Sequence, residues 1–288
     1  MPSASLPTID ERVVSELPPT DGLRLRASPS VVGSALHRCK ALISGLTSRS
    51  HSRGLGLSLG RRAAKGAAPS TIVEDGLVAE WRLDEGSGQT ITDCTGNGHN
   101  GVLGFTAGVD PFDPTWTAQG LSFDGTEASW FADAVGISGG VARTVIAVVK
   151  TGSSAEFGME WGGTGGNGER WALDRSSAGS LRLDIRGANF TSALTLPAST
   201  WCFIAATQSG ADLDTVRLYL NGASEASGVS ATIETTNGFI VGEASALTKQ
   251  MEAAYVLVYD RALSEVEVEQ NRRALRSILA GRGITLPW

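Results

Sequence analysis

Apolar residues recur at every second position in short runs along the chain from residue 76 onward. Eight such runs are rich in β-branched and aromatic residues and are bounded by Gly, Asn, Asp or Ser: GLVAEWRLDE, GLSFDG, TVIAVVK, SLRLDIRG, WCFIAATQ, TVRLYLNG, GFIVGEA and AYVLVYD. This alternation is typical of strands with one buried face. No helical stretch of about 10 to 15 residues separates the runs, so parallel βαβ units are excluded. We predict an all-β, antiparallel two-sheet sandwich of roughly eight to twelve strands.

Turn and helix signals agree with this architecture. Asn-Gly pairs at Asn221 and Asn237 predict tight turns, because both central residues of such turns adopt positive φ at little cost. One helix is expected near the C-terminus, where Ser264 and Glu267 have the spacing of a capping box. An apolar stripe follows, and a glycine at 281 or 283 would end the helix: Val268, Leu275, Ile278, Leu279.

The first 70 residues differ in composition from the rest. All 18 aromatic residues lie after residue 80, whereas six of the ten prolines fall in the first 70. A segment without aromatic residues buries too little surface to offset its conformational entropy. It carries ten Lys and Arg against four Asp and Glu, a net charge of +6, while residues 71–288 carry fourteen against twenty-six, a net charge of −12. We predict a basic arm and linker (1–70), a sandwich (71–263), and a C-terminal helix and tail (264–288).

The charge of the arm suggests that it contacts an acidic partner surface. The alternative is a solvated flexible tail. Residues 31–46 place apolar side chains at helical spacing and would form a short helix on a partner. No aromatic residue interleaves the basic ones, so base stacking is absent and nucleic acid is not an expected partner. Five basic residues are candidate anchors: Arg38, Lys40, Arg61, Arg62 and Lys65.

Several functional classes are disfavoured by residue inventory. The three cysteines, at 39, 94 and 202, are odd in number and far apart, so we expect free thiols. No apolar run approaches the ~18 residues of a membrane span, and the N-terminus lacks the features of a secretion signal. Export by the ordinary route is therefore not expected. Of the three histidines, at 37, 51 and 99, two fall in the arm, so a nucleophilic triad or a zinc centre is not expected either.

Two glycine-rich segments match GxGxxG: DCTGNGHNG at residues 93–101 and GTGGNG at residues 163–168. A dinucleotide site needs a preceding strand, a following helix and an acidic residue about 20 positions on. Neither segment has this setting, so both predict turns. Asp93, Asn97 and Asp124 are candidate ligands of a structural Ca²⁺, because hard cations prefer carboxylate and carbonyl oxygens on loops. The alternative is an Asx-type turn, in which Asp93 and Asn97 bond their own backbone.

Four segments together resemble the laminin G-like, concanavalin A-like jelly-roll family. They are GLVAEWRLDEGSGQTITDCTGNGHNGVL, GLSFDGTEASWF, STWCFIAATQSGADLDTVRLYLNGA and YVLVYDRALSEVEVEQ, and the resemblance covers residues 76 to about 270. Relatives usually carry Gly and an acidic residue where Ala253 and Ala254 stand, so a polar contact made there is expected to be absent. The resemblance implies a two-sheet sandwich with four aromatic residues in the core or on a sheet face: Trp81, Phe123, Trp201 and Tyr219.

Sugar binding is the task that the resemblance most often implies, and it needs exposed aromatic faces beside polar groups. Trp161 and Trp171 flank the loop GGTGGNGER, which contains Asn167, and Trp130 lies near a predicted strand edge. These four residues are the candidate carbohydrate site. Packing over the ends of the sandwich or a subunit contact are the alternatives.

Some members of the wider superfamily hydrolyse glycans, which requires two carboxylates about 5 to 9.5 Å apart. The acidic alternation Glu265, Glu267 and Glu269 falls in the predicted helix, and Asp212 and Asp214 fall in a turn. No acidic cluster is therefore expected on a sheet face, and the chain is not expected to be an enzyme.

The sandwich and the tail RGITLPW resemble parts of bacteriophage structural proteins and of bacterial surface proteins. We predict a non-catalytic module on a virion surface, a decoration or head-fibre protein assembled in the host cytoplasm. Its arm would attach to a capsid or other virion protein, and its sandwich would contact glycans or neighbouring subunits of a homo-oligomer. The alternatives are a bacterial cell-surface or secreted carbohydrate-binding protein and a glycoside hydrolase.

Overall fold

The computed structural model describes residues 70–104, 106–124, 130–132, 135–152, 158–162, 166–236, 238–242 and 250–287. The predicted turn at Asn237 and the segment 31–46 lie outside the described residues, as do the five candidate anchors, Arg38, Lys40, Arg61, Arg62 and Lys65.

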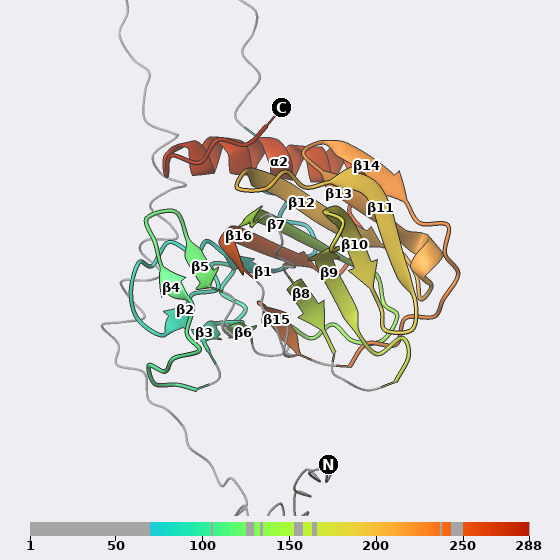
Figure 1. The fold of residues 1–288 in the computed structure, drawn as a ribbon, viewed down its shortest axis with the longest axis horizontal. Helices are drawn as coiled ribbons and strands as arrows, with labels where there is room; N and C mark the ends of the chain where they lie inside the picture. The colour runs from blue at the N-terminus through green and yellow to red at the C-terminus, as the bar shows by residue number, and fades with distance from the viewer. Residues whose placement is uncertain are drawn as a thin grey trace, which may run out of the picture. The chain divides into compact units, whose positions relative to one another are not determined.

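Two antiparallel eight-stranded sheets pack face to face (Figure 1). Sheet A runs in the order β14 (Ala223–Ala226), β13 (Val216–Leu220), β12 (Trp201–Gln208), β7 (Arg143–Thr151), β16 (Gln250–Tyr259), β5 (Leu121–Asp124), β4 (Thr115–Trp116), and β1 (Leu77–Trp81) also pairs with β16. Sheet B runs in the order β11 (Asn189–Thr195), β10 (Ser180–Asp184), β9 (Trp171–Arg175), β8 (Gly158–Trp161), β15 (Phe239–Val241), β6 (Trp130–Ala132), β3 (Gly101–Leu103), β2 (Thr90–Ile91). A short 3₁₀ turn, η2 (Leu213–Thr215), precedes β13.

The predicted antiparallel sandwich is confirmed, and each of the eight alternating runs contains a strand. The described residues form sixteen strands, more than the eight to twelve predicted. The additional strands include β2, β3, β4 and β6, which have only two or three residues each. A period of two cannot be recognised in so short a run, because pairing with a neighbour rather than local pattern defines these strands.

The main core lies between the sheets and is centred on stacked aromatic rings. The Trp81 ring stacks on Phe239 at 5.6 Å between centroids, and Phe239 also contacts Trp161 at 4.6 Å. Phe123 is buried in the same core. Trp201 and Tyr219 instead pack on the outer face of sheet A, so the four aromatic residues of the resemblance occupy the core or a sheet face as implied.

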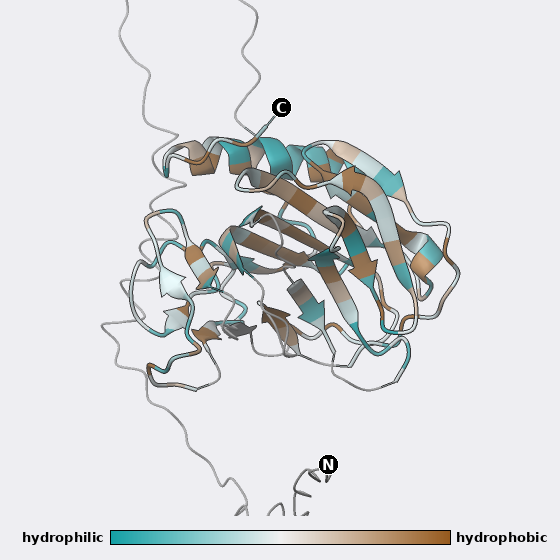
Figure 2. Cartoon of the chain, viewed as in Figure 1, coloured by the Kyte–Doolittle hydropathy of each residue, from teal (hydrophilic) through white to brown (hydrophobic). Residues whose placement is uncertain are grey.

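The outer face of sheet A is covered by helix α2 (Glu265–Ala280) (Figures 1 and 2). The capping box is present: Ser264 Oγ accepts a hydrogen bond from the Glu267 amide, and the Ser264 amide donates to Glu267 Oε2 at 2.8 Å. The predicted stripe is the buried one, since Val268, Leu275 and Leu279 pack against sheet A. The helix is therefore a third layer of this domain. No helix in the described part of the chain has the length and apolar character of a membrane span.

The tail after α2 is fixed by a half-buried arginine, Arg282. Arg282 Nη1 donates to the Arg82 carbonyl at 2.9 Å, and Arg282 Nη2 donates to the Ala254 carbonyl at 2.6 Å. Ala254 stands where the resemblance led us to expect a lost polar contact, and its carbonyl supplies a different one. These bonds hold residues 281–287 on sheet A, with Ile284 and Leu286 buried.

Candidate functional site

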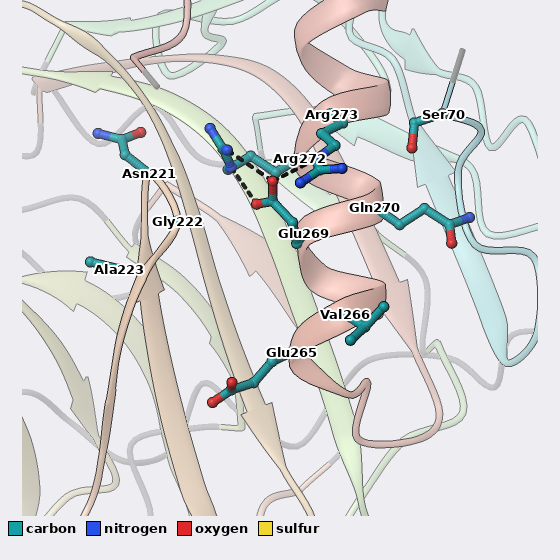
Figure 3. Close-up of a pocket in the computed structure, with 10 residues that line it drawn as sticks. All are labelled: Ser70, Asn221, Gly222, Ala223, Glu265, Val266, Glu269, Gln270, Arg272 and Arg273. Carbon is teal, nitrogen blue, oxygen red and sulfur yellow. Dashed lines mark hydrogen bonds and ion pairs between the residues drawn. The ribbon is translucent and has the colours of Figure 1, made fainter. Parts of the chain in front are cut away.

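A groove of about 980 Å³ lies between α2 and the turn that joins β13 to β14 (Figure 3). The turn is the predicted tight one, with φ of 49° at Asn221 and 97° at Gly222. On the helix side, Glu269 pairs with Arg272 at 2.6 Å and with Arg273 at 2.7 Å. The hydrogen bond from Arg272 lowers the pKa of Glu269, so this carboxylate and its two arginines form one ion-pair cluster.

Ser70, the last residue of the predicted arm and the first residue that the structure describes, also lines this groove. The segment after it is bound to α2, because Gln270 Nε2 donates to the Thr71 carbonyl at 2.9 Å and the Val73 amide donates to Asn271 Oδ1 at 2.8 Å. At the other end, Arg272 Nη1 donates to the Pro287 carbonyl at 3.2 Å. Residues 70 and 287 therefore both lie on the α2 side of the sandwich.

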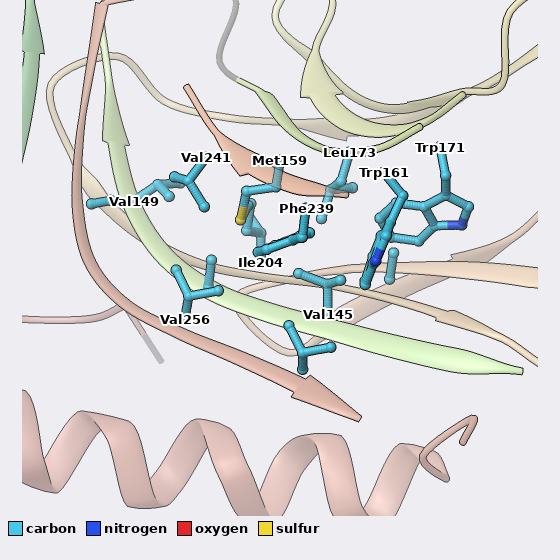
Figure 4. Close-up of a cluster of buried hydrophobic side chains, with 14 of the residues drawn as sticks. Val145, Val149, Met159, Trp161, Trp171, Leu173, Ile204, Phe239, Val241 and Val256 are labelled. Atoms are coloured by element: carbon cyan, nitrogen blue, oxygen red, sulfur yellow. The ribbon is translucent and has the colours of Figure 1, made fainter. Parts of the chain in front are cut away.

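The two tryptophans of the predicted carbohydrate site, Trp161 and Trp171, are completely buried (Figure 4). They pack edge to face at 5.1 Å inside the main core. The prediction that they present exposed faces is wrong, because Trp161 and Trp171 pair in register and both side chains lie on the core face of sheet B. A sugar ring cannot stack on either residue.

One end of the core is held by polar groups around these two rings. Trp171 Nε1 donates to Gln208 Oε1 at 2.7 Å, and the guanidinium of Arg143 lies 5.1 Å from the Trp161 ring centroid. Arg143 is itself buried and donates to the Thr235 hydroxyl at 3.0 Å. Desolvation lowers the pKa of Arg143 to about 10, which leaves it charged at neutral pH.

The other two predicted carbohydrate residues lie on sheet B. Trp130 belongs to β6, where its backbone pairs with Leu103 and Val241; its side chain is outside the described part. Asn167 is exposed in the turn between β8 and β9. This turn packs on the turn after β10, since a Cβ on Gly187 would lie 2.5 Å from Asn167 Cγ. Of the four residues, Asn167 is the one whose side chain the structure places at the surface.

Beside Asn167, the outer face of sheet B carries five charged side chains, which we call the ion-pair face: Glu160, Arg170, Asp174, Arg182 and Asp184. The four that lie on strands point away from the core because their strand neighbours Met159, Leu173 and Leu183 point into it, and Arg170 lies immediately before β9. Pairing register brings them together: Glu160 and Asp184 both lie opposite Ala172, and Asp174 lies opposite Arg182.

Arg170 joins two of the carboxylates. Its Nε donates to Glu160 Oε2 at 2.9 Å, and its Nη1 lies 3.9 Å from Asp184 Oδ1. Ala172 stands between these two acids in the register. The small side chain of Ala172 leaves room for the guanidinium to span from one acid to the other.

Arg182 makes the second pair of the ion-pair face. Its Nε and Nη2 donate to the two carboxylate oxygens of Asp174 at 2.8 and 2.7 Å, a bidentate contact. Asp174 is 1% exposed and Glu160 is 4% exposed, whereas the side chains of Arg170, Arg182 and Asp184 are each between 22% and 23% exposed. The surface of the face is therefore formed by two arginines and one aspartate above two buried acids.

The expectation that no acidic cluster lies on a sheet face is wrong. Glu160, Asp174 and Asp184 belong to three different strands, so no local sequence pattern predicts that they lie close together. Two acids that are two strands apart are separated by about 10 Å between backbones. Each of the three carboxylates has an arginine partner. A glycosidase, in contrast, uses one carboxyl group as a proton donor and the other as a nucleophile or base.

The candidate calcium ligand Asp93 is occupied by protein hydrogen bonds. Its Oδ1 accepts from the amides of Glu80 and Thr95, at 3.2 and 3.0 Å, and its Oδ2 accepts from the His99 amide at 3.1 Å. Asn97 Nδ2 donates to the Val78 carbonyl at 2.8 Å. Asp93 therefore makes the Asx-type contact of the alternative, through the Thr95 amide, whereas Asn97 bonds to β1 instead of its own turn.

The third candidate, Asp124, lies elsewhere. Asp124 pairs with Gln250 on β16, whereas Trp81, which bridges to Asp93, pairs with Val256. Six residues along a strand correspond to about 20 Å, so the register does not bring Asp93 and Asp124 together. The described residues contain no group of three His, Cys, Asp or Glu side chains arranged to hold a metal. A calcium requirement stays a prediction.

The cysteines differ in state. Cys202 is free and buried, and burial raises the pKa of its thiol. Cys94 is disulfide-bonded, so the expectation of free thiols is wrong for this residue. An odd number of cysteines excludes complete pairing but does not exclude one bridge.

Comparison with known proteins agrees with the fold. Residues 124–269 match the sequence model of the Concanavalin A-like lectin/glucanases superfamily. None of the curated proteins matches the chain. Trypanosoma rangeli sialidase, solved in complex with sialic acid, is similar in structure with a TM-score of 0.56 at 13% identity; the similarity covers 87% of this chain and 39% of the sialidase.

Two further solved domains are similar at lower scores. The binding domain of Paraclostridial Mosquitocidal Protein 1 has a TM-score of 0.49 at 17% identity, over 68% of this chain and 51% of that one. Domain 4 of AbnA, a GH43 extracellular arabinanase from Geobacillus stearothermophilus solved with arabinotriose, has a TM-score of 0.47 at 15% identity, over 69% and 98%. At 13% identity the similarity to the sialidase describes the fold alone.

Proposed function

Because the chain belongs to the concanavalin A-like lectin/glucanase superfamily, we propose that it is a non-catalytic binding module whose ion-pair face contacts glycans. The observation that carries the proposal is the set of planar charged groups fixed on β8, β9 and β10 by mutual ion pairs. Fixed guanidinium and carboxylate groups donate to and accept from sugar hydroxyls without first losing side-chain freedom. Their mutual pairing also argues against a catalytic role for the acids.

We further propose that the module is displayed on a particle, as a virion decoration or head-fibre protein. Residues 70 and 287 lie on the α2 side, and the ion-pair face is on sheet B, across the core from α2. An attachment through the arm at residues 1–70 would therefore leave the ion-pair face directed away from the particle. The arm's net charge of +6 supports an acidic attachment surface.

A glycan panel tests the binding proposal. Full-length protein is screened against immobilised neutral and acidic oligosaccharides, and the affinity for each bound glycan is measured with Arg170→Ala and with Arg273→Ala as the matched control. Arg273 is an exposed arginine on α2 that also pairs with a glutamate. We expect Arg170→Ala to weaken binding about tenfold, equivalent to about 1.4 kcal/mol, and Arg273→Ala to leave it unchanged. Absence of binding to the whole panel would reject the proposal.

A second experiment tests attachment. The five candidate anchors are replaced together by alanine: Arg38, Lys40, Arg61, Arg62 and Lys65. Co-purification with virus-like particles and the Tm of the variant are each compared with those of the wild type. We expect loss of particle association with an unchanged Tm, because none of these positions belongs to the sandwich. Undiminished incorporation of the variant would contradict the anchoring role.

A further inference from the structure

The charge state of the ion-pair face points to the class of glycan that it accepts. Its five residues comprise three carboxylates and two guanidiniums, a net charge of −1 among the described residues. The adjoining turns add one charge of each sign, Glu169 and Arg186, and leave this balance unchanged. The surrounding part of the chain, residues 71–288, carries −12. A carboxylated sugar approaching this face therefore meets a negative surface.

Both arginines of the face are already committed to carboxylates of the protein. Arg182 holds Asp174 in a bidentate pair, and Arg170 holds Glu160 at 2.9 Å. A sugar carboxylate that took either guanidinium would loosen its pair with an acid that is at most 4% exposed. Breaking a pair in which one charge is buried is strongly unfavourable, so anionic recognition through these arginines is suppressed.

A neutral glycan does not need such an exchange. The exposed portions of Arg170, Arg182 and Asp184, with Asn167 in the neighbouring turn, offer donors and acceptors in one surface. A sugar hydroxyl is both donor and acceptor, so it bonds to a carboxylate edge and a guanidinium edge while the ion pairs persist. We infer that the ion-pair face selects neutral glycans over glycans that carry carboxylates. This inference rests on the proposed function.

Matched glycan pairs test the inference with the full-length protein. Each pair contains a uronic-acid or sialylated oligosaccharide and its carboxyl-reduced or desialylated counterpart, titrated at low ionic strength. We expect the neutral member to bind at least about tenfold more tightly, and the difference to shrink as salt is raised. Equal or tighter binding of the carboxylated member would overturn the inference while leaving glycan binding intact. Binding of neither member in any pair would overturn the proposed function and the inference together.

Asp184→Asn identifies the source of the selectivity. In the wild type, the Arg186 amide donates to Asp184 Oδ1 at 2.8 Å. Asparagine keeps a side-chain oxygen that can accept this bond but removes the negative charge that faces Arg170. We expect the preference for the neutral member to fall at least about threefold, mainly through tighter binding of the carboxylated one. Asp75→Asn, which removes an exposed charge beside α2, is the control and should not change the ratio. An unchanged ratio in Asp184→Asn would contradict the assignment to the ion-pair face.

Discussion

The two sheets of the sandwich share one core but have different outer faces. The outer face of sheet A is apolar and lies under α2, whereas that of sheet B carries the ion-pair face on β8, β9 and β10. The strands reflect this: β12 is buried along its whole length, whereas β10 alternates between buried and partly exposed positions. A continuous apolar run therefore marks a strand covered on both sides, and an alternating run marks a strand with one polar outer face.

The largest loss of stability is expected from Leu275→Ala, on the buried face of α2. Leu275 is fully buried against sheet A, and removing a buried leucine side chain costs about 2 to 5 kcal/mol through lost transfer energy and the cavity left behind. Chemical denaturation of the variant and of the wild type measures this loss as a difference in the free energy of unfolding. Ser277→Ala on the exposed side of the same helix is the control, expected to be within about 0.5 kcal/mol of wild type. Equal effects would mean that α2 does not act as a covering layer.

A smaller loss is expected from Tyr255→Phe. Tyr255 is buried under α2 and its hydroxyl donates to Glu80 Oε1. Burial raises the pKa of Tyr255 well above its usual value, so the hydroxyl keeps its proton. Phenylalanine fills the same space but leaves the buried Glu80 carboxylate with one donor fewer, at a cost of about 1 to 3 kcal/mol. Calorimetric unfolding of the variant checks this, and an unchanged Tm would show that the bond contributes nothing.

The capping box should contribute about 1 kcal/mol, seen as the stability lost in Ser264→Ala. Its contribution depends on pH. The hydrogen bond from Arg261, followed by those from Ser264, lowers the pKa of Glu267 to about 2. The folded pKa lies below the unfolded one, so the stabilisation is complete above about pH 4.5 and is lost as pH falls toward 2. The free energy of unfolding, measured with urea between pH 6 and pH 2, should depend less on pH in Glu267→Gln than in wild type. The same pH dependence in both proteins would show that Glu267 ionisation does not contribute to stability.

The smallest effect on stability is expected on the other side of the molecule. Asp184→Asn should change the free energy of unfolding by less than about 0.5 kcal/mol, because its contact with Arg170 is long, at 3.9 Å, and partly exposed. The same variant is expected to alter glycan selectivity. A stability loss as large as that of Leu275→Ala would mean that the ion-pair face is a structural element rather than a binding surface.

Local signals predicted a large part of this fold. The alternating runs, the Asn221 turn and the Ser264 capping box each depend on residues close together in sequence, and each is present. The ion-pair face was not predictable in this way, because Glu160, Asp174 and Asp184 become neighbours only through the register of β8, β9 and β10. Trp161 and Trp171 show the same limit of prediction. Two tryptophans on either side of a loop do not indicate whether their side chains lie on the core face or on the outer face of the sheet.

The most direct measurement is hydrogen exchange on the full-length protein with and without the tightest-binding glycan of the panel. The account predicts slower exchange in the turns at residues 166–170 and 185–188, which adjoin the ion-pair face, with no change in α2 or in the turn at residues 221–223. Protection of α2 and the 221–223 turn with none on sheet B would contradict the account, because it would place the glycan in the groove on the attachment side.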